Sequence, residues 1–486
     1  MALAGQSPGP ESGFLIPEFR RLRRAFALGL VTGVVYFTGT LYWITGVMSV
    51  YGGLPTWVAV LINAAMIACL AMHPALCAAI VYRIVRASGP FSLMAAPLVW
   101  VATELSRTLV PHIGFPWVLL GYSQANLLPI AQLASVFGVY GVSMLVAAVS
   151  AALATLAVAR RDTRRFLPMG LMVAIVLAVG LWGRARLARS EWTREGDPIR
   201  VGLVQGNVDQ AVKWDVAHAS SIFDDHLRLT RQALAAGAEF VLWPESSMPF
   251  FFEEDRADSD KLRALARDAR VPILFGSDQV EWRSGNGRRA VDRLYNAAFL
   301  VRPDGSTAGV YRKMHLVPFG EYVPLKRFLF FAAPLVEAVS DFSAGETVEL
   351  LPVGDHRVST AICYEIVYSE LVRRSVVAGS ELLTTITNDA WFGRTSAPYQ
   401  HFAQASMRAI EDGRYLVRSA NTGISGIVDP YGRVLEQTAI FQQAVVVGSV
   451  RFLRASTFYA RHGDVLAYAS VVITLALLLV TRRRVQ

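Results

Sequence analysis

The amino-acid sequence predicts an α/β domain inserted into a polytopic α-helical membrane domain. The 486-residue chain is 53% hydrophobic, with a mean hydropathy of +0.38, and its long apolar stretches gather near the two ends. Between them, from about residue 199 to 452, short β-branched runs alternate with polar helical segments. Such an excess of apolar residues is typical of membrane helices, and strands separated by helices are typical of an α/β fold.

Six apolar stretches are long or apolar enough to be predicted as membrane spans, since a hydrocarbon core of ~30 Å needs about 20 helical residues. They are Ala25–Met48, Trp57–Val81, Phe91–Val110, Leu128–Val158, Phe166–Trp182 and the shorter Val465–Val480. The segment before Ala25 is polar and rich in Pro and Gly, which indicates an uncleaved anchor and not a removable signal peptide. The predicted parts are an N-terminal segment (1–24), a membrane domain (25–192), the α/β domain (193–460) and a last helix with its tail (461–486).

Arginine clusters flank these spans on one side only. They are Arg20, Arg21, Arg23, Arg24, Arg83, Arg86, Arg160, Arg161, Arg164, Arg165, Arg482, Arg483 and Arg484. The connections "SVYGGLPT" and "PHIGFPWVLLGYSQANLLP" carry neither Lys nor Arg. The positive-inside rule therefore puts both termini in the cytoplasm and the α/β domain outside. The net charge of +9 and the pI of 9.6 thus reflect topology, and no nucleic-acid partner is expected.

Eight runs in the middle region are predicted to be strands, and Ala219–Ala236 is predicted to be a helix with its charges on one side. Gly183–Asp197 is predicted to be the linker that leaves the membrane. The strand-like runs are "IRVGLVQGNV", "FVLWPES", "VPILFGSD", "LYNAAFLV", "VSTAICYEI", "LLTTITNDAWFG", "SGIVDPYGRV" and "AVVVGSV".

Three reactive residues follow separate strand-like runs of this domain. They are Glu245 in "WPES", Lys313 in "YRKMHL" and Cys363 in "AICYE". A lone Cys in a β-branched run is more often a buried structural residue than a nucleophile. Because α/β folds bring strand ends to one edge, we expect the three residues to lie together. A thiol, a carboxylate base and a cation at one place suit acyl transfer. The usual pKa values of Glu and Cys differ by about 4, so moving the proton from thiol to carboxylate costs roughly 6 kcal/mol. We expect burial of Glu245 and the charge of Lys313 to narrow that gap.

The segments around these residues resemble the nitrilase (carbon–nitrogen hydrolase) superfamily, as do "TNDAWFG" and "RSANTGISGIVDPYG". The stretches "TELSRTLVPHIGFPWVLLGYSQ" and "VQGNVDQAVKWD" are similar to its membrane-embedded branch, the apolipoprotein N-acyltransferases, and the resemblance runs from about Ala25 to Arg484. It implies a nitrilase-like α-β-β-α sandwich, a Glu245–Lys313–Cys363 triad and a bacterial inner membrane with the catalytic domain in the periplasm. That family usually has two further spans before the catalytic domain.

The same resemblance implies supporting roles for three neighbours of the triad. Glu321 is expected to be a second carboxylate that orients the lysine, Tyr364 to lie at the thioester, and Glu365 to support the site. Each also has a purely structural interpretation. Glu321, after Gly320, could simply be part of a turn, and Tyr364 and Glu365 could be ordinary residues at a strand end.

Further candidates for substrate contact come from aromatic and intramembrane residues. Trp214 and Trp391 are core aromatics or substrate contacts, and Asn388 mainly shapes a loop. Two loops, "SMPFFF" with Phe251 and "FLFFAAPLV" with Phe330, either pack into the core or flank an acyl-chain entrance. Glu104 and Arg107 lie three residues apart near the outer end of a span and form either a functional site or a structural pair.

The predicted function is two-step acyl transfer. Cys363 takes an acyl chain from a membrane phospholipid as a thioester and passes it to the α-amino group of the N-terminal diacylglyceryl-cysteine of an apolipoprotein. Donor and acceptor are implied by the resemblance alone. Two alternatives remain, a membrane-tethered amidase or nitrilase that hydrolyses C–N bonds, and a transporter or scaffold with an inactive domain. No cofactor and no metal is expected, since His315, His356 and His401 lack ligand-like spacing with Cys, and we expect a monomer.

Overall fold

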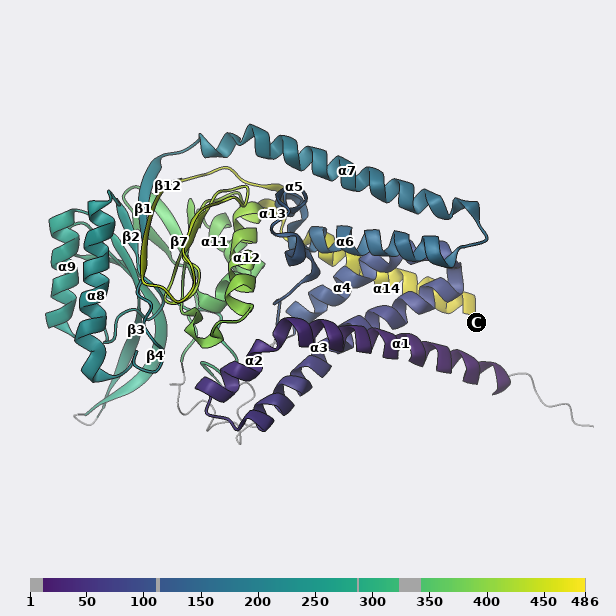
Figure 1. Ribbon diagram of the computed structural model, residues 1–486, viewed down its shortest axis with the longest axis horizontal. Coiled ribbons are helices and arrows are strands. Elements are labelled where there is room, and N and C mark those ends of the chain that lie inside the picture. Colours follow the sequence, from purple (N-terminus) through teal and green to yellow (C-terminus); the bar gives the residue numbers. More distant parts are fainter. Residues whose placement is uncertain (1–11, 111–113, 286–287, 323–341, 486) are drawn as a thin grey trace, which may run out of the picture.

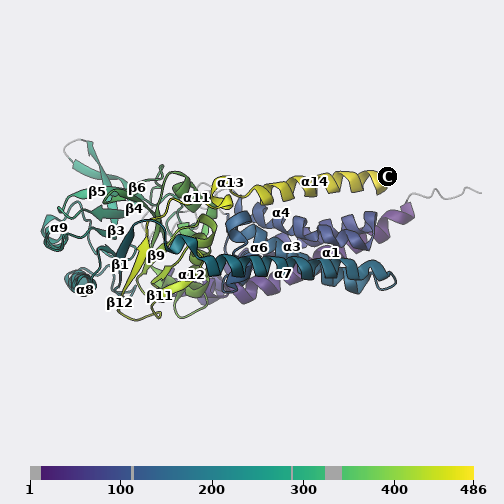
Figure 2. The same ribbon diagram turned by 90° about the horizontal axis from the view of Figure 1, so that it is seen from above.

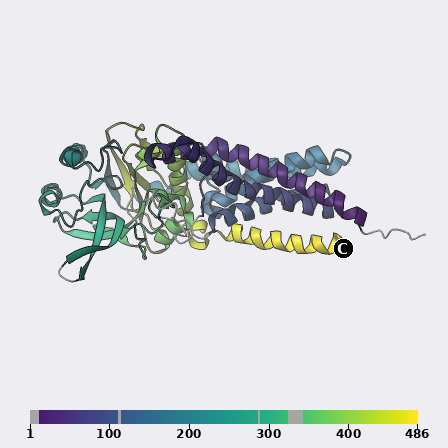
Figure 3. The same ribbon diagram turned by 90° about the horizontal axis from the view of Figure 1, so that it is seen from below.

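The computed structural model describes residues 12–110, 114–285, 288–322 and 342–485. The α/β domain lies at one end of an elongated molecule, and long helices extend from it (Figure 1). Figures 2 and 3 show these helices running alongside one another, with the C-terminal end of α14 at the end far from the α/β domain.

Five helices within the described residues are long and apolar enough to cross a membrane: Phe19–Leu41, Thr56–Ser88, Ala134–Val158, Thr163–Thr193 and Val465–Arg482. They belong to α1 (Ser12–Leu41), α3 (Thr56–Ser88), α6 (Ala134–Val158), α7 (Phe166–Arg189) and α14 (Val465–Val485). Shorter helices near the α/β domain are α2 (Trp43–Gly46), α5 (Leu128–Ala131) and α13 (Phe458–His462).

The predicted span Phe91–Val110 is not one continuous helix. It contains a 3-10 turn, Pro90–Ala95, followed by α4 (Ala96–Thr108), whose 13 residues extend only about 20 Å at 1.5 Å per residue. Likewise, the predicted linker from Gly183 is still helical, because α7 continues to Arg189.

Two six-stranded sheets form the α/β domain. The first has the order β12-β1-β2-β3-β4-β5 and the second the order β11-β10-β9-β8-β7-β6. Their strands are β1 (Pro198–Gln205), β2 (Phe240–Leu242), β3 (Ile273–Gly285), β4 (Arg288–Val301), β5 (Thr307–Arg312), β6 (Leu350–Val353), β7 (His356–Ile362), β8 (Leu382–Thr387), β9 (Leu416–Ala420), β10 (Gly426–Val428), β11 (Val434–Gln437) and β12 (Ala444–Arg451). The neighbours β1–β2–β3 and β7–β8–β9 are parallel, so their carboxyl ends share an edge within each sheet.

The sheets pack face to face and each carries helices on its outer face, which makes the predicted α-β-β-α sandwich. Leu203 and Leu242 of the first sheet share a core cluster with Ile362 and Ile386 of the second. The helices α8 (Val216–Ala235) and α9 (Arg256–Ala269) cover the first sheet, and α11 (Ser369–Val377) and α12 (Ala397–Asp412) cover the second. Asp215 and Asp255 begin the outer helices as N-caps, each accepting a main-chain N–H with its side chain.

The helix α12 lies between the second sheet and the membrane helices, and 13 of its 16 residues are buried. At this junction the α6 backbone is non-helical at Phe137 and Gly138, and Gly138 has φ +63°, which favours glycine. The break frees the N–H of Val139, which donates to Oε1 of Glu411 at 2.7 Å. The α/β domain is therefore attached to the membrane helices by hydrogen bonds as well as by the chain connections.

Candidate active site

Glu245 follows β2 and its carboxylate is held by three donors from three different segments. Oε1 accepts from Nδ2 of Asn296 on β4 at 2.8 Å and from Nζ of Lys313 at 3.3 Å. Oε2 accepts from the main-chain N–H of Asn388, just past β8, at 2.8 Å. Asn388 thus does more than shape a loop, because its backbone binds the candidate base.

Lys313 directly follows β5, is 1% exposed, and lies between two carboxylates. Its Nζ is 2.9 Å from Oε1 of Glu321 and 3.3 Å from Oε1 of Glu245. Asn296 also donates to Oε1 of Glu321, at 3.0 Å, and Oε2 of Glu321 accepts the N–H of Val317 at 2.8 Å. The ammonium is consequently paired and oriented, as a buried charge must be.

Cys363 follows β7 and begins a 3-10 turn, Cys363–Val367, with φ +52°. A non-glycine residue held in this region stores about 1–3 kcal/mol of strain. Nε2 of His401 lies 3.1 Å from the Cys363 carbonyl oxygen and carries the proton, because a carbonyl only accepts. Nδ1 of His401 lies 3.0 Å from both Oδ1 of Asp389 and Nη2 of Arg418, and all three side chains are fully buried. This cluster holds the backbone of Cys363 in place.

Glu365 joins the Cys363 turn to the segment that carries Lys313. Oε2 accepts the N–H of Ile362 at 2.7 Å, and Oε1 accepts the N–H groups of Met314 at 2.7 Å and His315 at 3.0 Å. Burial raises the pKa of Glu365 to about 7, and these hydrogen bonds act in the opposite direction. Glu365 therefore ties the backbone just before Cys363 to the backbone just after Lys313.

The electrostatics of the resting site oppose thiolate formation. Burial raises the pKa of the Cys363 thiol, Glu245 raises it further, and Lys313 lowers it by less. Burial alone would raise the pKa of Glu245, but Lys313, Lys213 and hydrogen bonds from Asn296 and Asn388 outweigh it, and the net pKa lies below its usual value. The expected narrowing of the pKa gap is therefore wrong, because Lys313 bonds directly to the carboxylate and favours its ionised form.

Tyr364 contacts the membrane domain through its aromatic ring. Its ring lies 6.2 Å from that of Trp117 and 6.4 Å from that of Phe115, both nearly parallel to it. Tyr368 reinforces this contact by donating to the carbonyl of Gly114 at 2.7 Å. The residue after Cys363 thus packs against a loop of the membrane domain.

The two predicted tryptophans lie in different surroundings. Trp391 is half-buried, and its ring is 5.3 Å from that of Tyr51, whose hydroxyl donates to the carbonyl of Ala390 at 2.9 Å. Trp214 is 52% exposed, and the ammonium of Lys213 lies 5.6 Å from its ring centroid. Trp214 is consequently no core aromatic, whereas Trp391 is part of the contact between the two domains.

The aromatic loop after Glu245 divides between core and surface. Phe252 is 1% exposed and packs 4.7 Å from Phe275, so it belongs to the core. Phe250 packs 5.2 Å from Phe223 of α8, whereas Phe251 is 41% exposed. Only Phe251 stays a candidate for substrate contact in this loop. Phe330 and the second loop lie outside the described residues.

Glu104 and Arg107 on α4 are both buried but form no ion pair in the part of the chain that the structure describes. Oε1 of Glu104 accepts the N–H of Leu120 at 2.7 Å, and the guanidinium of Arg107 lies 5.2 Å from the ring of Phe37. The two side chains therefore make no direct ion-pair contact, and each also has a partner on another segment.

Sequence reasoning missed Lys213, Asn296 and the His401 cluster. Lys213 is a second buried ammonium, and it donates to the main-chain carbonyl of Glu245 at 3.2 Å. Burial lowers its pKa to about 8. Lys213 and Asn296 lie in segments that the sequence motifs cover, whereas His401 lies between two of them, and no spacing rule links any of the three to Glu245 or Cys363.

The comparisons with known proteins first define the class of the α/β domain. A profile of the carbon-nitrogen hydrolase family matches residues 200–457. Among solved structures, a mutant of the amidase from Nesterenkonia sp. in complex with butyramide is 21% identical, with a TM-score of 0.38, over 54% of this chain and 93% of that chain. The profile match, together with the α-β-β-α architecture, makes this part a carbon–nitrogen hydrolase domain.

Matches that extend over the membrane helices define the family. A profile of the apolipoprotein N-acyltransferase N-terminal domain matches residues 13–152. The apolipoprotein N-acyltransferase of Geobacter metallireducens is 40% identical over 454 residues, 92% of this chain and 85% of that protein. The enzyme of the same name from Methylococcus capsulatus is 35% identical over 450 residues, 91% of this chain and 84% of that protein. The chain belongs to the apolipoprotein N-acyltransferase family.

Proposed function

We propose that this protein N-acylates apolipoproteins in two steps, with Cys363 as nucleophile, Glu245 as base and Lys313 as the cation that stabilises the oxyanion. The donor is a membrane phospholipid, and the acceptor is the α-amino group of an N-terminal diacylglyceryl-cysteine. The observation that carries the proposal is the packing of Tyr364 against Phe115 and Trp117, because it places the nucleophile's turn directly beside the membrane domain.

In the first step, Sγ of Cys363 attacks the ester carbon while its proton passes to Glu245. The C–O bond of the ester then breaks, Glu245 returns the proton to the leaving alkoxide, and a lysophospholipid departs from a thioester. Lys313, whose Nζ lies 3.3 Å from Glu245 and 2.9 Å from Glu321, supplies the positive charge that stabilises the oxyanion in this proposal.

In the second step, the neutral acceptor amine attacks the thioester carbon. The new C–N bond forms, the C–S bond breaks, and Glu245 carries the amine proton to the departing sulfur. An α-amino group with a pKa near 8 is partly neutral at working pH, so a weak base suffices. The depressed pKa of Glu245 is compatible with this requirement.

The positions of the arginines support a periplasmic α/β domain and cytoplasmic termini. Arg160–Arg165 form the turn between α6 and α7, and this turn lies at the same far end of the helices as the end of α14 (Figure 1). The cationic ends are thus opposite the α/β domain, as the positive-inside rule requires for a domain outside the cytoplasm of a bacterial inner membrane. We further propose that the enzyme acts as a monomer.

Intact mass spectrometry after incubation with a phospholipid tests the proposal. The protein should gain the mass of one acyl chain, lose it on treatment with hydroxylamine, and lose it to a synthetic diacylglyceryl-cysteine peptide. Release of the acyl chain to water at the same rate with and without peptide would instead identify a hydrolase.

A further inference from the structure

Lys213 is a second ammonium group beside the candidate base, and it has no role in the triad. The residue is 5% exposed, and its Nζ donates to the main-chain carbonyl of Glu245 at 3.2 Å. Among the described residues, this ammonium forms no ion pair with a carboxylate. The segment between β1 and α8 thus places a buried cation directly on the backbone of Glu245.

Hydrogen bonds from the second sheet fix the segment that carries Lys213. Asn421, just past β9, exchanges two hydrogen bonds of 2.8 Å with the backbone of Val208. Nδ2 of Asn388 donates to Oε1 of Gln210 at 2.7 Å. The ammonium is therefore held at a defined place by its own segment, and its position does not depend on a bound substrate.

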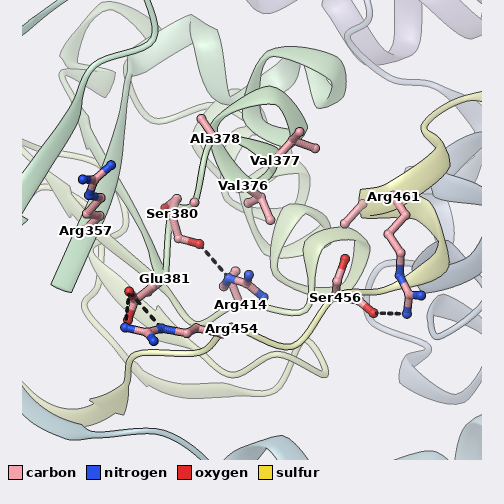
Figure 4. A pocket seen from close by; sticks show the side chains of 12 residues that line it. Arg357, Val376, Val377, Ala378, Ser380, Glu381, Arg414, Arg454, Ser456 and Arg461 are labelled. Atoms are coloured by element: carbon pink, nitrogen blue, oxygen red, sulfur yellow. Dashed lines mark hydrogen bonds and ion pairs between the residues drawn. The ribbon is translucent and has the colours of Figure 1, made fainter.

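A cavity of about 10 Å³ lies beside this ammonium, and its lining includes Lys213, Glu245 and His226. It shares no lining residue with the larger cavity of about 600 Å³, which Arg357 lines near the start of β7 (Figure 4). Burial lowers the pKa of His226 to about 4, so this histidine brings no charge to the cavity at neutral pH. A single water molecule needs about 10–15 Å³. The cavity is therefore too small for a substrate group, and the neighbour on which Lys213 acts is Glu245.

The charges around Glu245 show why a second cation is needed. Nζ of Lys313 lies 2.9 Å from Glu321 and 3.3 Å from Glu245, so one ammonium serves two carboxylates. A buried carboxylate without a compensating charge takes up a proton, and a protonated Glu245 is no base. Lys213 lowers the pKa of Glu245 alongside Lys313. Two further titratable groups interact with Glu245: the Cys363 thiol, whose raised pKa keeps it neutral, and Asp278, whose pKa burial raises to about 7.

We propose that Lys213 is a positioning residue whose ammonium keeps Glu245 ionised, so that this carboxylate accepts the proton of the Cys363 thiol during acylation. The inference rests on the proposed function, in which Glu245 is the base. Burial lowers the pKa of Lys213 to about 8, and the ammonium is therefore charged throughout the acidic range in which Glu245 titrates.

Three substitutions of Lys213 separate its charge from its hydrogen bond. Lys213→Met removes both, Lys213→Gln removes the charge but keeps an N–H donor, and Lys213→Arg keeps the charge. The matched control, Lys261→Met, removes an exposed ammonium of α9 that is paired with Asp258. Single-turnover acylation of Cys363 by phosphatidylglycerol is followed by intact mass from about pH 4 to pH 8. The proteins are full-length, in maltoside micelles, and their melting temperatures are measured at each pH.

We expect the rate to fall on the acid side, where Glu245 takes up a proton. The midpoint of this fall should lie about one pH unit higher in Lys213→Met and Lys213→Gln than in the wild type, because a nearby opposite charge lowers a carboxylate pKa by about 1–3. Lys213→Arg and Lys261→Met should keep the wild-type midpoint, and the half-saturating lipid concentration should be the same in all five proteins. A wild-type midpoint in Lys213→Met or Lys213→Gln, or an equal shift in Lys213→Arg, would overturn the proposal.

Alkylation of Cys363 by iodoacetamide distinguishes failure of this inference from failure of the proposed function, because it needs no lipid. The ammonium of Lys213 and a Cys363 thiolate attract each other. Lys213→Met should therefore be alkylated more slowly than the wild type at pH 7, with the difference lost above pH 9, where Lys213 is neutral. If no protein forms an acyl-enzyme, the proposed function fails. Slower alkylation would then still support the electrostatic role of Lys213, whereas equal alkylation would overturn it as well.

Discussion

Replacing His401 tests whether its hydrogen bond to the Cys363 carbonyl sets the geometry of the nucleophile. In His401→Phe a ring of similar size remains, but the donor at 3.1 Å is lost. In His401→Gln a side-chain amide N–H can take its place. The ion pair of Asp389 and Arg418, at 2.8 Å, does not need His401 and persists in both variants.

The expected loss of rate follows from the free energies that the lost hydrogen bond offsets, namely the cost of an unpaired buried carbonyl and the backbone strain at Cys363. A buried carbonyl without a donor costs about 1–3 kcal/mol, and relaxation of Cys363 out of its left-handed conformation would recover strain of about the same size. If this free energy appears in the barrier to acylation, His401→Phe slows thioester formation about 5- to 150-fold, at 1.36 kcal/mol per factor of ten. His401→Gln should lie within about fivefold of the wild type, since one neutral hydrogen bond is worth about 1 kcal/mol.

The assay is single-turnover formation of the acyl-enzyme, followed by intact mass at several phospholipid concentrations. Because His401 contacts the main chain and not the lipid, the maximal rate should fall while the half-saturating lipid concentration stays constant. The control His218→Phe changes an exposed histidine on α8 and should leave both values unchanged. Equal rates in His401→Phe and His401→Gln, or a change in the half-saturating concentration alone, would refute this reasoning.

Four further outcomes are expected. Cys363→Ala should abolish thioester formation while membrane insertion persists; retained transfer would remove its assignment as nucleophile. Since the pKa of the Cys363 thiol is raised, its alkylation by iodoacetamide should be slower than that of a free cysteine at pH 7 and still increase above pH 9, and a plateau near neutrality would contradict this. Phe251→Ser should slow the reaction with lipid more than the alkylation of Cys363, and it should leave the melting temperature unchanged. Phe252→Ser, by contrast, should lower the free energy of unfolding by about 3–5 kcal/mol. Equal losses in all assays for Phe251→Ser would place Phe251 in the core. In spheroplasts an impermeant reagent should label cysteines introduced into the α/β domain and spare the Arg160–Arg165 turn, and the reverse pattern would invert the proposed topology.

Local pattern was sufficient for the fold class, and it singled out the candidate site residues. Apolar length predicted most of the membrane helices, and alternating β-branched runs predicted an α/β domain between them. Glu245, Lys313 and Cys363 became candidates because each follows a strand-like run, and carboxyl ends of parallel strands meet at one edge. Their roles as a triad came from the family resemblance. These properties depend on residues close together in the chain, so they can be deduced from the sequence alone.

The protonation energetics and the surroundings of each side chain were decided by tertiary structure. The pKa of Glu245 is depressed by Lys313, Lys213, Asn296 and Asn388, which come from four separate segments, so no local pattern predicts its direction. Glu104 accepts an N–H from a residue sixteen positions further along the chain, a contact that the spacing along its own helix does not predict. Electrostatic interactions and hydrogen bonds depend on distances in space, and those distances exist only once both sheets and the membrane helices have packed together.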